Sequence, residues 1–109
     1  MKINYKGKEI EVSKLKQYKG KLGDLKIPEG WKLLTIDIYD YLISNHLKEF
    51  NPKKRDVIIQ NLGYNYNRGY SHAVAWFGAG SDEVVLDCYR VPQNSGSALG
   101  VAFWREINV

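Results

Sequence analysis

The spacing of apolar residues changes at Asn51-Pro52, and this change limits the folds open to the chain. Before it, apolar side chains recur every three or four residues, as on one face of an α-helix: Ile36, Tyr39, Ile43, Leu47 and Phe50. Thr35 is a suitable N-cap, and Asp37 places a negative charge near the positive end of the helix. Pro52 disfavours helical geometry in the residue before it. The pattern therefore predicts one helix over residues 36–50.

After the proline, the apolar residues follow the spacing of β-strands. The candidate strands are Val57–Leu62, Ala73–Phe77, Val84–Arg90 and Leu99–Ile107. The segments between them are rich in glycine, asparagine and serine, which favour turns and loops. One helix followed by a run of antiparallel strands predicts an α+β domain with the helix packed on a sheet.

The N-terminal segment has the pattern of a β-hairpin. Residues 2–5 and 9–12 alternate apolar with polar side chains, and Lys6-Gly7-Lys8 links them with the glycine that a tight turn requires. Residues 13–26 are polar, and a short helix near 14–19 fits them. Their expected anchors in the core are Leu15, Tyr18, Leu22 and Leu25. We predict a single domain, 1–109, in which residues 1–26 form a basic hairpin and connector and residues 27–107 form the core.

The stretch PEGWKLLT, residues 28–35, stands at the predicted helix entrance. Gly30 is expected to permit a close backbone approach, and Trp31 to fill a large volume beneath the sheet. Leu33 and Leu34 are expected to continue the core, while the threonine satisfies amide groups at the helix start. We interpret the stretch as structural rather than catalytic.

PEGWKLLT and the segment SALGVAFWR, residues 97–105, resemble motifs of the C-type-lectin-like superfamily, in the branch of the formylglycine-generating-enzyme-like proteins. Trp76-Phe77 also resembles a core strand of that branch. Relatives usually carry proline where this chain has Leu34, and often arginine where it has Ala102, so no role of that arginine is transferred. The resemblance covers residues 27–107 and implies a C-type-lectin-like fold.

The sequence offers little for catalysis or metal binding. Formylglycine-generating enzymes use paired cysteines, whereas Cys88 is the only cysteine here and is expected to be a small buried residue. Val91-Pro92-Gln93-Asn94 lacks the Trp-Asn-Asp partner of a calcium-dependent sugar site. His46 and His72 lack the spacing of a zinc site, and the neighbouring Ser71 would point to the opposite strand face from His72. We therefore expect no enzyme activity, cofactor or metal.

Two loops have the composition of a binding surface. Tyrosine offers a large contact area with few rotatable bonds, and asparagine, serine and glycine offer adaptable hydrogen bonding. The predicted ligand-binding residues lie in loops 64–70 and 89–97: Tyr64, Asn65, Tyr66, Asn67, Arg68, Tyr70, Tyr89, Arg90, Gln93 and Asn94. The alternative is that the amides are ordinary loop residues and the tyrosines cover the core.

Residues 64–97 also resemble the variable region of variable proteins from diversity-generating retroelements. Those proteins hold a constant lectin-type scaffold while tyrosine, asparagine, serine, glycine, aspartate and arginine are favoured at the varied positions. The residues that resemble their fixed scaffold are Trp76, Phe77, Leu99, Gly100 and Val101. The resemblance implies recognition of a protein or a surface glycan.

The positive charge suggests a different class of partner. The net charge is +4, and residues 1–26 carry eight lysines against Glu9, Glu11 and Asp24. These lysines and the tyrosines could form a small nucleic-acid-binding protein that uses the N-terminal hairpin. The hairpin lysines alternate with apolar residues, however, as on a solvated strand face, and this favours the first hypothesis.

Nothing in the sequence directs the chain into or across a membrane. No apolar run approaches the roughly 20 residues needed to span a bilayer. The N-terminus, MKINYKGKEIEV, lacks the continuous apolar region of a signal peptide. We expect no membrane insertion, and a protein that is cytoplasmic or carried by a virion or a surface partner.

Overall fold

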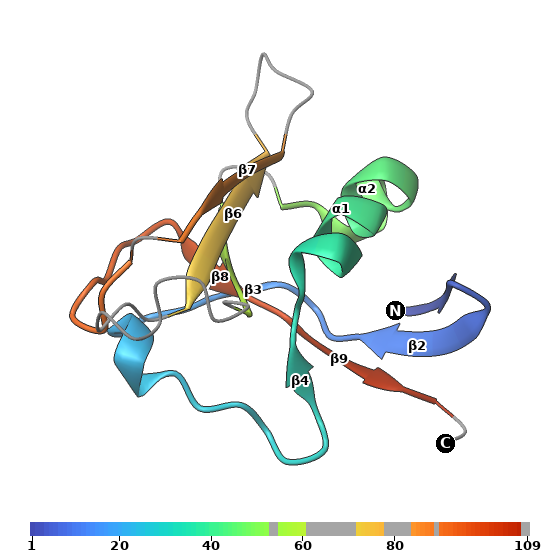
Figure 1. Cartoon of the computed structure of the whole chain (residues 1–109), viewed down its shortest axis with the longest axis horizontal. Coiled ribbons are helices and arrows are strands. Elements are labelled where there is room, and N and C mark those ends of the chain that lie inside the picture. The colour runs from blue at the N-terminus through green and yellow to red at the C-terminus, as the bar shows by residue number, and fades with distance from the viewer. Residues whose placement is uncertain (53–54, 61–71, 78–83, 89, 108–109) are drawn as a thin grey trace.

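A computed structural model describes residues 1–52, 55–60, 72–77, 84–88 and 90–107. In this part, the chain forms an α+β fold with two α-helices and two β-sheets (Figure 1). The elements in chain order are β1 (Lys2–Tyr5), β2 (Lys8–Val12), β3 (Lys16–Gln17), the 3₁₀ helix η1 (Leu22–Asp24), β4 (Lys32–Leu33), α1 (Ile36–Asn45), α2 (Leu47–Phe50), β5 (Asp56–Ile59), β6 (Ala73–Phe77), β7 (Val84–Asp87), β8 (Leu99–Val101) and β9 (Phe103–Glu106).

The two sheets differ in how their strands pair. The four-stranded sheet has the order β1-β2-β9-β4, and every pair in it is antiparallel. The five-stranded sheet has the order β3-β8-β5-β6-β7, in which β5 and β8 are parallel. The expectation of antiparallel strands throughout is therefore wrong for this pair. After β5 the chain first builds β6 and β7 on one side, and β8 then returns to the other side of β5, a long connection that permits parallel pairing.

The last predicted strand, Leu99–Ile107, is two strands in different sheets. β8 and β9 are separated at Ala102, which is completely buried. At this point the chain leaving β2 is also fixed, because Ser13 N donates to Phe103 O at 2.8 Å and Phe103 N donates to Ser13 Oγ at 2.8 Å. The small alanine thus lets one continuous segment join the two sheets.

The predicted N-terminal hairpin is confirmed. Lys6 and Gly7 form a two-residue turn with positive φ angles of 50° and 78°, as expected for a turn that matches the twist of the flanking strands. Ile3 and Ile10 lie opposite each other and are buried. The second strand begins at Lys8, one residue earlier than the alternation indicated.

The predicted helix exists but is interrupted. Ile38 N donates to the Thr35 side chain at 3.2 Å, so the predicted N-cap is confirmed. The helix stops at Asn45 and resumes after His46, whose φ of −137° and ψ of 36° are not helical. The break changes the direction of the predicted apolar stripe, and Leu47 is 44% exposed rather than buried. The buried face of α1 is Ile38, Tyr39, Leu42 and Ile43.

Of the other predicted strand and helix boundaries, some agree with the structure and some do not. β6 has the predicted bounds, whereas β7 ends at Asp87 rather than at residue 90. β5 covers Asp56–Ile59, and positions 61–62 of its predicted range lie outside the described residues. The short helix expected near 14–19 is wrong, because β3 forms there and the 3₁₀ helix follows it. Among the expected anchors, Leu22 is completely buried, and the others are partly buried.

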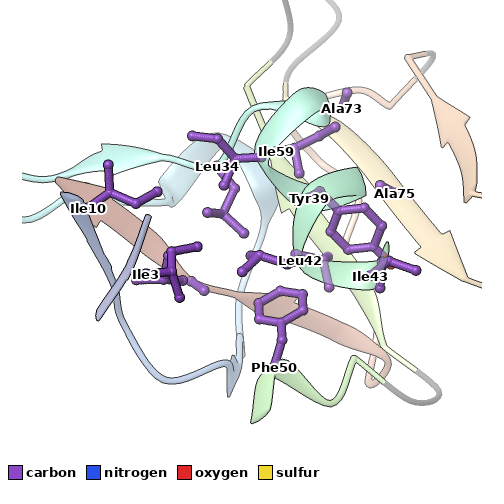
Figure 2. Packing of buried hydrophobic residues seen from close by; sticks show 14 residues of the cluster. Ile3, Ile10, Leu34, Tyr39, Leu42, Ile43, Phe50, Ile59, Ala73 and Ala75 are labelled. Atoms are coloured by element: carbon purple, nitrogen blue, oxygen red, sulfur yellow. The ribbon is translucent and has the colours of Figure 1, made fainter. Parts of the chain in front are cut away.

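The core has two parts, one on each face of the five-stranded sheet. On one face, side chains of α1 and α2 pack against Ile59, Ala73 and Ala75 and extend to the hairpin (Figure 2). Tyr39 and Phe50 meet there edge to face, with ring centroids 5.9 Å apart. On the other face lies a smaller cluster: Leu22, Leu33, Ile58, Val74 and Leu99. The segment between β2 and β4 therefore covers a sheet face that the helices leave uncovered.

PEGWKLLT performs only part of its predicted role. Leu33 and Leu34 are buried, as predicted, but in different clusters. Trp31 is only partly buried and belongs to neither cluster of the described residues, so its expected role beneath the sheet is wrong. It continues the β4 register to a position across from Arg105, whose guanidinium carbon lies 4.3 Å from its ring centroid.

Gly30 serves a turn rather than a close approach. Its φ is +82°, and a Cβ built there would meet no atom within 4 Å. Trp31 N donates to Pro28 O at 3.1 Å, which closes a β-turn with the glycine in its third position. A positive φ at that position is the requirement of a type II turn, and glycine meets it without steric cost.

Candidate functional site

Three of the predicted ligand-binding residues lie in the described part of the chain: Arg90, Gln93 and Asn94. The other seven lie outside the described residues: Tyr64, Asn65, Tyr66, Asn67, Arg68, Tyr70 and Tyr89. The site can therefore be described for the second loop, from Arg90 to Ser97, and for the elements that contact it. In Figure 1 this loop lies beside η1.

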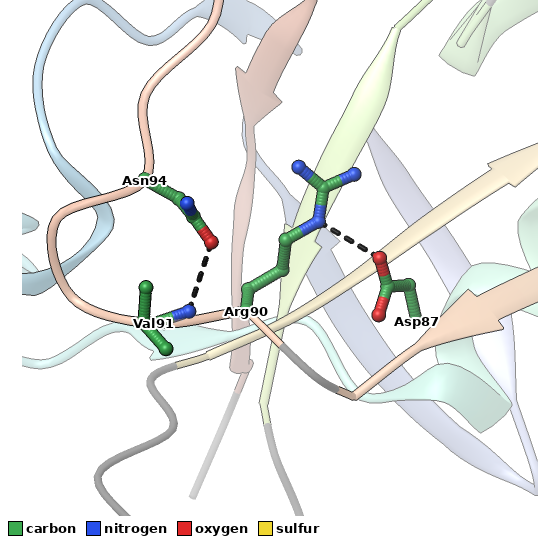
Figure 3. A network of polar contacts seen from close by, with 4 residues as sticks. All are labelled: Asp87, Arg90, Val91 and Asn94. Atoms are coloured by element: carbon green, nitrogen blue, oxygen red, sulfur yellow. Dashed lines mark hydrogen bonds and ion pairs between the residues drawn. The ribbon is translucent and has the colours of Figure 1, made fainter.

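Arg90 is held by the strand that precedes it. Its Nε donates to Asp87 Oδ2 at 2.9 Å, and about 29% of the arginine side chain and 28% of the aspartate side chain are exposed (Figure 3). Asp87 is the last residue of β7, so the ion pair fixes the start of the loop to the end of the sheet. One edge of the guanidinium is thus used by the protein itself.

Asn94 closes a turn within the same loop. Val91 N donates to Asn94 Oδ1 at 2.9 Å, and Asn94 N donates to Val91 O at 3.0 Å (Figure 3). An asparagine side chain that accepts from a nearby backbone amide is a common way to fix a turn. Pro92 and Gln93 stand exposed at the tip. Among the three described residues, Gln93 is the one whose side chain is directed to solvent by this arrangement.

The 3₁₀ helix η1 fixes the turn from the other side. Leu22 N donates to Asn94 O at 2.9 Å, and Gly23 N donates to Pro92 O at 3.0 Å. The two backbones are so close that a Cβ on Gly23 would lie 2.7 Å from Pro92 Cβ. Because the Leu22 side chain is anchored in the smaller core cluster, these contacts tie the loop tip to the core.

The remainder of the loop is attached at Ser97. Its carbonyl oxygen accepts from Gln17 Nε2 at 2.9 Å and from Arg55 Nη1 at 3.0 Å. Ser95 and Ser97 are nevertheless exposed, like Gln93. The loop therefore has a fixed backbone and presents an amide and two hydroxyl-bearing side chains to solvent, which is an arrangement suited to hydrogen bonding with a polar ligand.

The segment that carries η1 is strongly basic. We call residues 13–27 the connector. It contains Lys14, Lys16, Lys19, Lys21 and Lys26 against Asp24, whereas the rest of the chain carries eleven basic and eleven acidic side chains. The whole net charge of +4 is thus in the connector. All five lysines are exposed, and within the described part of the chain none has a carboxylate or an aromatic ring as a partner.

The charges of the four-stranded sheet, in contrast, are matched locally. Glu11 lies between Lys2 and Arg105 in the strand register, and Arg105 Nη2 is 2.7 Å from Glu11 Oε1. The hydrogen bond from Arg105, aided by nearby positive charges, lowers the pKa of Glu11. Lys8 Nζ is 3.6 Å from Glu106 Oε1. An open depression of about 370 Å³ beside these strands is lined by Lys2, Glu11, Arg105, Glu106 and Ile107.

Two residues of chemically reactive types, His72 and Cys88, lie in the described ranges. No group of three or more histidine, cysteine, aspartate or glutamate side chains that could hold a metal ion occurs there. Burial lowers the pKa of His72, which favours the neutral form of the ring. Burial, followed by the negative charge of Asp87, raises the pKa of the Cys88 thiol, so the reactive thiolate is disfavoured. Cys88 is partly buried and packs against the larger cluster.

The sequence interpretation did not foresee the contact between the loop and the connector. The excess of lysines in residues 1–26 was visible, but the separation into a matched hairpin and an unmatched connector was not. That separation depends on Glu106 and Arg105, which lie far along the chain and reach the hairpin only through the pairing of β9 with β2. A glycine within a polar segment, Gly23, was the one local sign of a close backbone approach.

Comparison of the chain with family models, with curated proteins and with solved structures gives no match. Of the helices in the described residues, none has the length and apolar character required to cross a bilayer. The residues and their geometry therefore carry the functional argument.

Proposed function

We propose that this chain is a non-enzymatic recognition domain that binds a protein or a surface glycan through loops 64–70 and 89–97. The observation that carries the proposal is the fixed backbone of the second loop. This backbone accepts hydrogen bonds from η1 and, at the Ser97 carbonyl, from Gln17 and Arg55, while the tip of the loop remains exposed. A preorganised loop loses little conformational freedom on binding, and this favours affinity. We also propose that the α+β fold of this chain is C-type-lectin-like.

Within this proposal, the first loop supplies contact area and the second supplies hydrogen bonds. The contact area is proposed to come from Tyr64, Tyr66 and Tyr70, because a tyrosine side chain covers a large surface of the ligand at a small entropic cost. Gln93 supplies an exposed amide, while Arg90 and Asn94 mainly hold the loop in shape. The relation to retroelement variable proteins is also proposed, and a neighbouring reverse transcriptase gene with a near-identical template copy of the 3′ end would support it.

Arrays of surface glycans and of folded proteins test the binding function. We expect the wild-type chain to bind a restricted set of array members, and the double variant Tyr66→Ala, Tyr70→Ala to lose that binding while its unfolding transition is unchanged. Tyr41→Phe is the control, because Tyr41 OH donates to Asn4 O at 2.8 Å and so belongs to the contact between α1 and β1. An absence of binding to every array member, or unchanged binding by the double variant, would contradict the proposal.

We give less weight to the alternative, a small nucleic-acid-binding protein that uses the N-terminal hairpin. That alternative relies on the lysines of the hairpin, and Lys8 and Lys2 lie beside Glu106 and Glu11. A duplex or single strand would have to compete with these carboxylates. The lysines of the connector offer a second surface for an anionic partner, and they lead to a narrower inference.

A further inference from the structure

The connector presents an array of exposed positive charge that carboxylates in the described part of the chain do not match. Lys14, Lys16, Lys19, Lys21 and Lys26 are all exposed, and Asp24 is the only acidic residue among them. Like charges held along one segment repel each other, and this repulsion is relieved when an anionic polymer binds and its counterions are released. The same argument does not apply to the four-stranded sheet, where carboxylates already lie beside the cations.

The chemistry of the connector favours some polyanions over others. It contains no arginine, and its one aromatic residue, Tyr18, is partly buried with its hydroxyl donating to Lys21 O at 2.7 Å. Energetic centres of protein interfaces are usually Trp, Tyr and Arg, and lysine is depleted there. Binding of single-stranded nucleic acid relies on exposed aromatic rings that stack on bases. The connector therefore lacks the anchors for an acidic protein or for a single strand.

The loop beside the connector adds a second requirement on the ligand. Gly23 and Leu22 donate backbone hydrogen bonds to Pro92 and Asn94, so the lysines on either side of η1 lie next to the loop tip. That tip exposes the amide of Gln93 and two serine hydroxyls, which can donate to and accept from sugar hydroxyls. A ligand that suits both the lysines and the loop carries several anionic groups as well as free hydroxyl groups.

We infer that the connector and residues 93–97 together bind a linear acidic polysaccharide, whose sulfate or carboxylate groups contact the lysines and whose hydroxyls contact the loop. The inference rests on the proposed recognition function and names its ligand class. It places the charge contacts on residues 14–26 rather than on the hairpin. Binding through several lysines predicts a steep dependence of affinity on salt concentration.

Calorimetric titration with a heparin oligosaccharide, repeated over a series of salt concentrations, tests this inference. We expect the wild type to bind heparin and not a neutral dextran of the same length. The double variant Lys19→Gln, Lys21→Gln should lower the slope of log affinity against log salt by about two, one for each lost contact. The matched control, Lys6→Gln with Lys8→Gln, loses the same charge from the hairpin and should keep the wild-type slope.

Three results would overturn the inference. These are undetectable heparin binding at low salt, an equal loss of binding in the two double variants, and binding of a short duplex DNA as tight as that of heparin. The last result would identify nucleic acid as the partner. If Gln93→Ala abolishes recognition of an array ligand while the lysine variants do not, the inference fails and the proposed function stands. If the lysine variants and Gln93→Ala weaken heparin binding but the double tyrosine variant has no effect on any ligand, the inference stands and the proposed use of both loops fails.

Discussion

The four-stranded sheet and the connector carry similar residues but use their charges in opposite ways. In the sheet, Lys8 and Arg105 lie within 4 Å of Glu106 and Glu11, respectively. In the connector, five exposed lysines have no such partner in the described part of the chain. Both regions are rich in basic residues, but the strands of the sheet carry four basic residues against three glutamates, whereas the connector carries five lysines against Asp24. The comparison teaches that pairing across strands, together with composition, decides which charges are available to a ligand.

The largest expected effect comes from detaching the connector from the core. Leu22→Ala removes a completely buried side chain from the smaller cluster and should lower the free energy of unfolding by about 2–5 kcal/mol. Leu47→Ala makes the same chemical change at a residue that is 44% exposed, and should stay within about 0.5 kcal/mol of wild type. Urea titrations of both variants measure the difference. Equal effects would show that η1 is not an anchor.

A smaller effect is expected at the contact between the connector and the loop. Gly23→Ala places a methyl group 2.7 Å from Pro92 Cβ, so the two backbones must separate, with a cost of about 1–3 kcal/mol. Gly96→Ala is the control, because a Cβ there meets no atom within 4 Å. Thermal unfolding measures the cost, and heparin affinity measures whether the loop has moved. A Gly23→Ala protein as stable as the control would refute the close contact.

The matched charges of the sheet are tested by Arg105→Gln. This change removes the hydrogen bond that lowers the pKa of Glu11, so NMR titration should find the pKa closer to its ordinary value of 4.5. A carboxyl group with a lowered pKa in the folded state stabilises the fold above its unfolded pKa, and that stabilisation is lost as the pH falls through the folded pKa. The variant should therefore lose less stability below pH 4.5 than wild type does. An unchanged pKa would contradict the pairing.

The smallest expected effect on stability belongs to the connector lysines. Lys19→Gln with Lys21→Gln removes two exposed charges that have no carboxylate partner among the described residues, so the free energy of unfolding should change by no more than about 0.5 kcal/mol. Chemical unfolding measures this directly. A clear loss of stability would mean that these lysines support the fold, and the comparison between the two regions would then lose its basis.

The elements that could be predicted from the sequence are those fixed by neighbouring residues. The turn at Lys6-Gly7 and the cap at Thr35 follow from backbone preferences within a few positions, and both are confirmed. β6 was predicted with its bounds because it is a short apolar run between loop residues. In each case, the local preference and the final fold agree.

The predictions that depended on distant partners were wrong. Residues 99–107 read as one strand because every second side chain is suited to a sheet, but two different sheets accept its two halves. Trp31 was placed in the core by its size, whereas it lies across from Arg105, whose guanidinium stands over its ring, and it belongs to neither core cluster of the described residues. The interruption at His46 likewise comes without a proline or glycine in the sequence to mark it.

The residues of the candidate site could be predicted from composition, but the contacts among them could not. The loop residues stood out as polar, and the structure gives Arg90 and Asn94 internal bonds that no composition reveals. The lysines stood out as well, yet their link to the loop through Gly23 and Pro92 spans about 70 positions of the chain. Contacts of that sequence separation are set by tertiary structure, which a local pattern does not specify.

NMR titration of the labelled chain with a heparin oligosaccharide tests most directly whether the unmatched lysines form the recognition surface. We expect the largest chemical-shift changes at residues 14–26 and 93–97, and none on β1, β2 and β9, whose charges are already matched. Changes centred on the hairpin and β9, with the connector unaffected, would contradict the account.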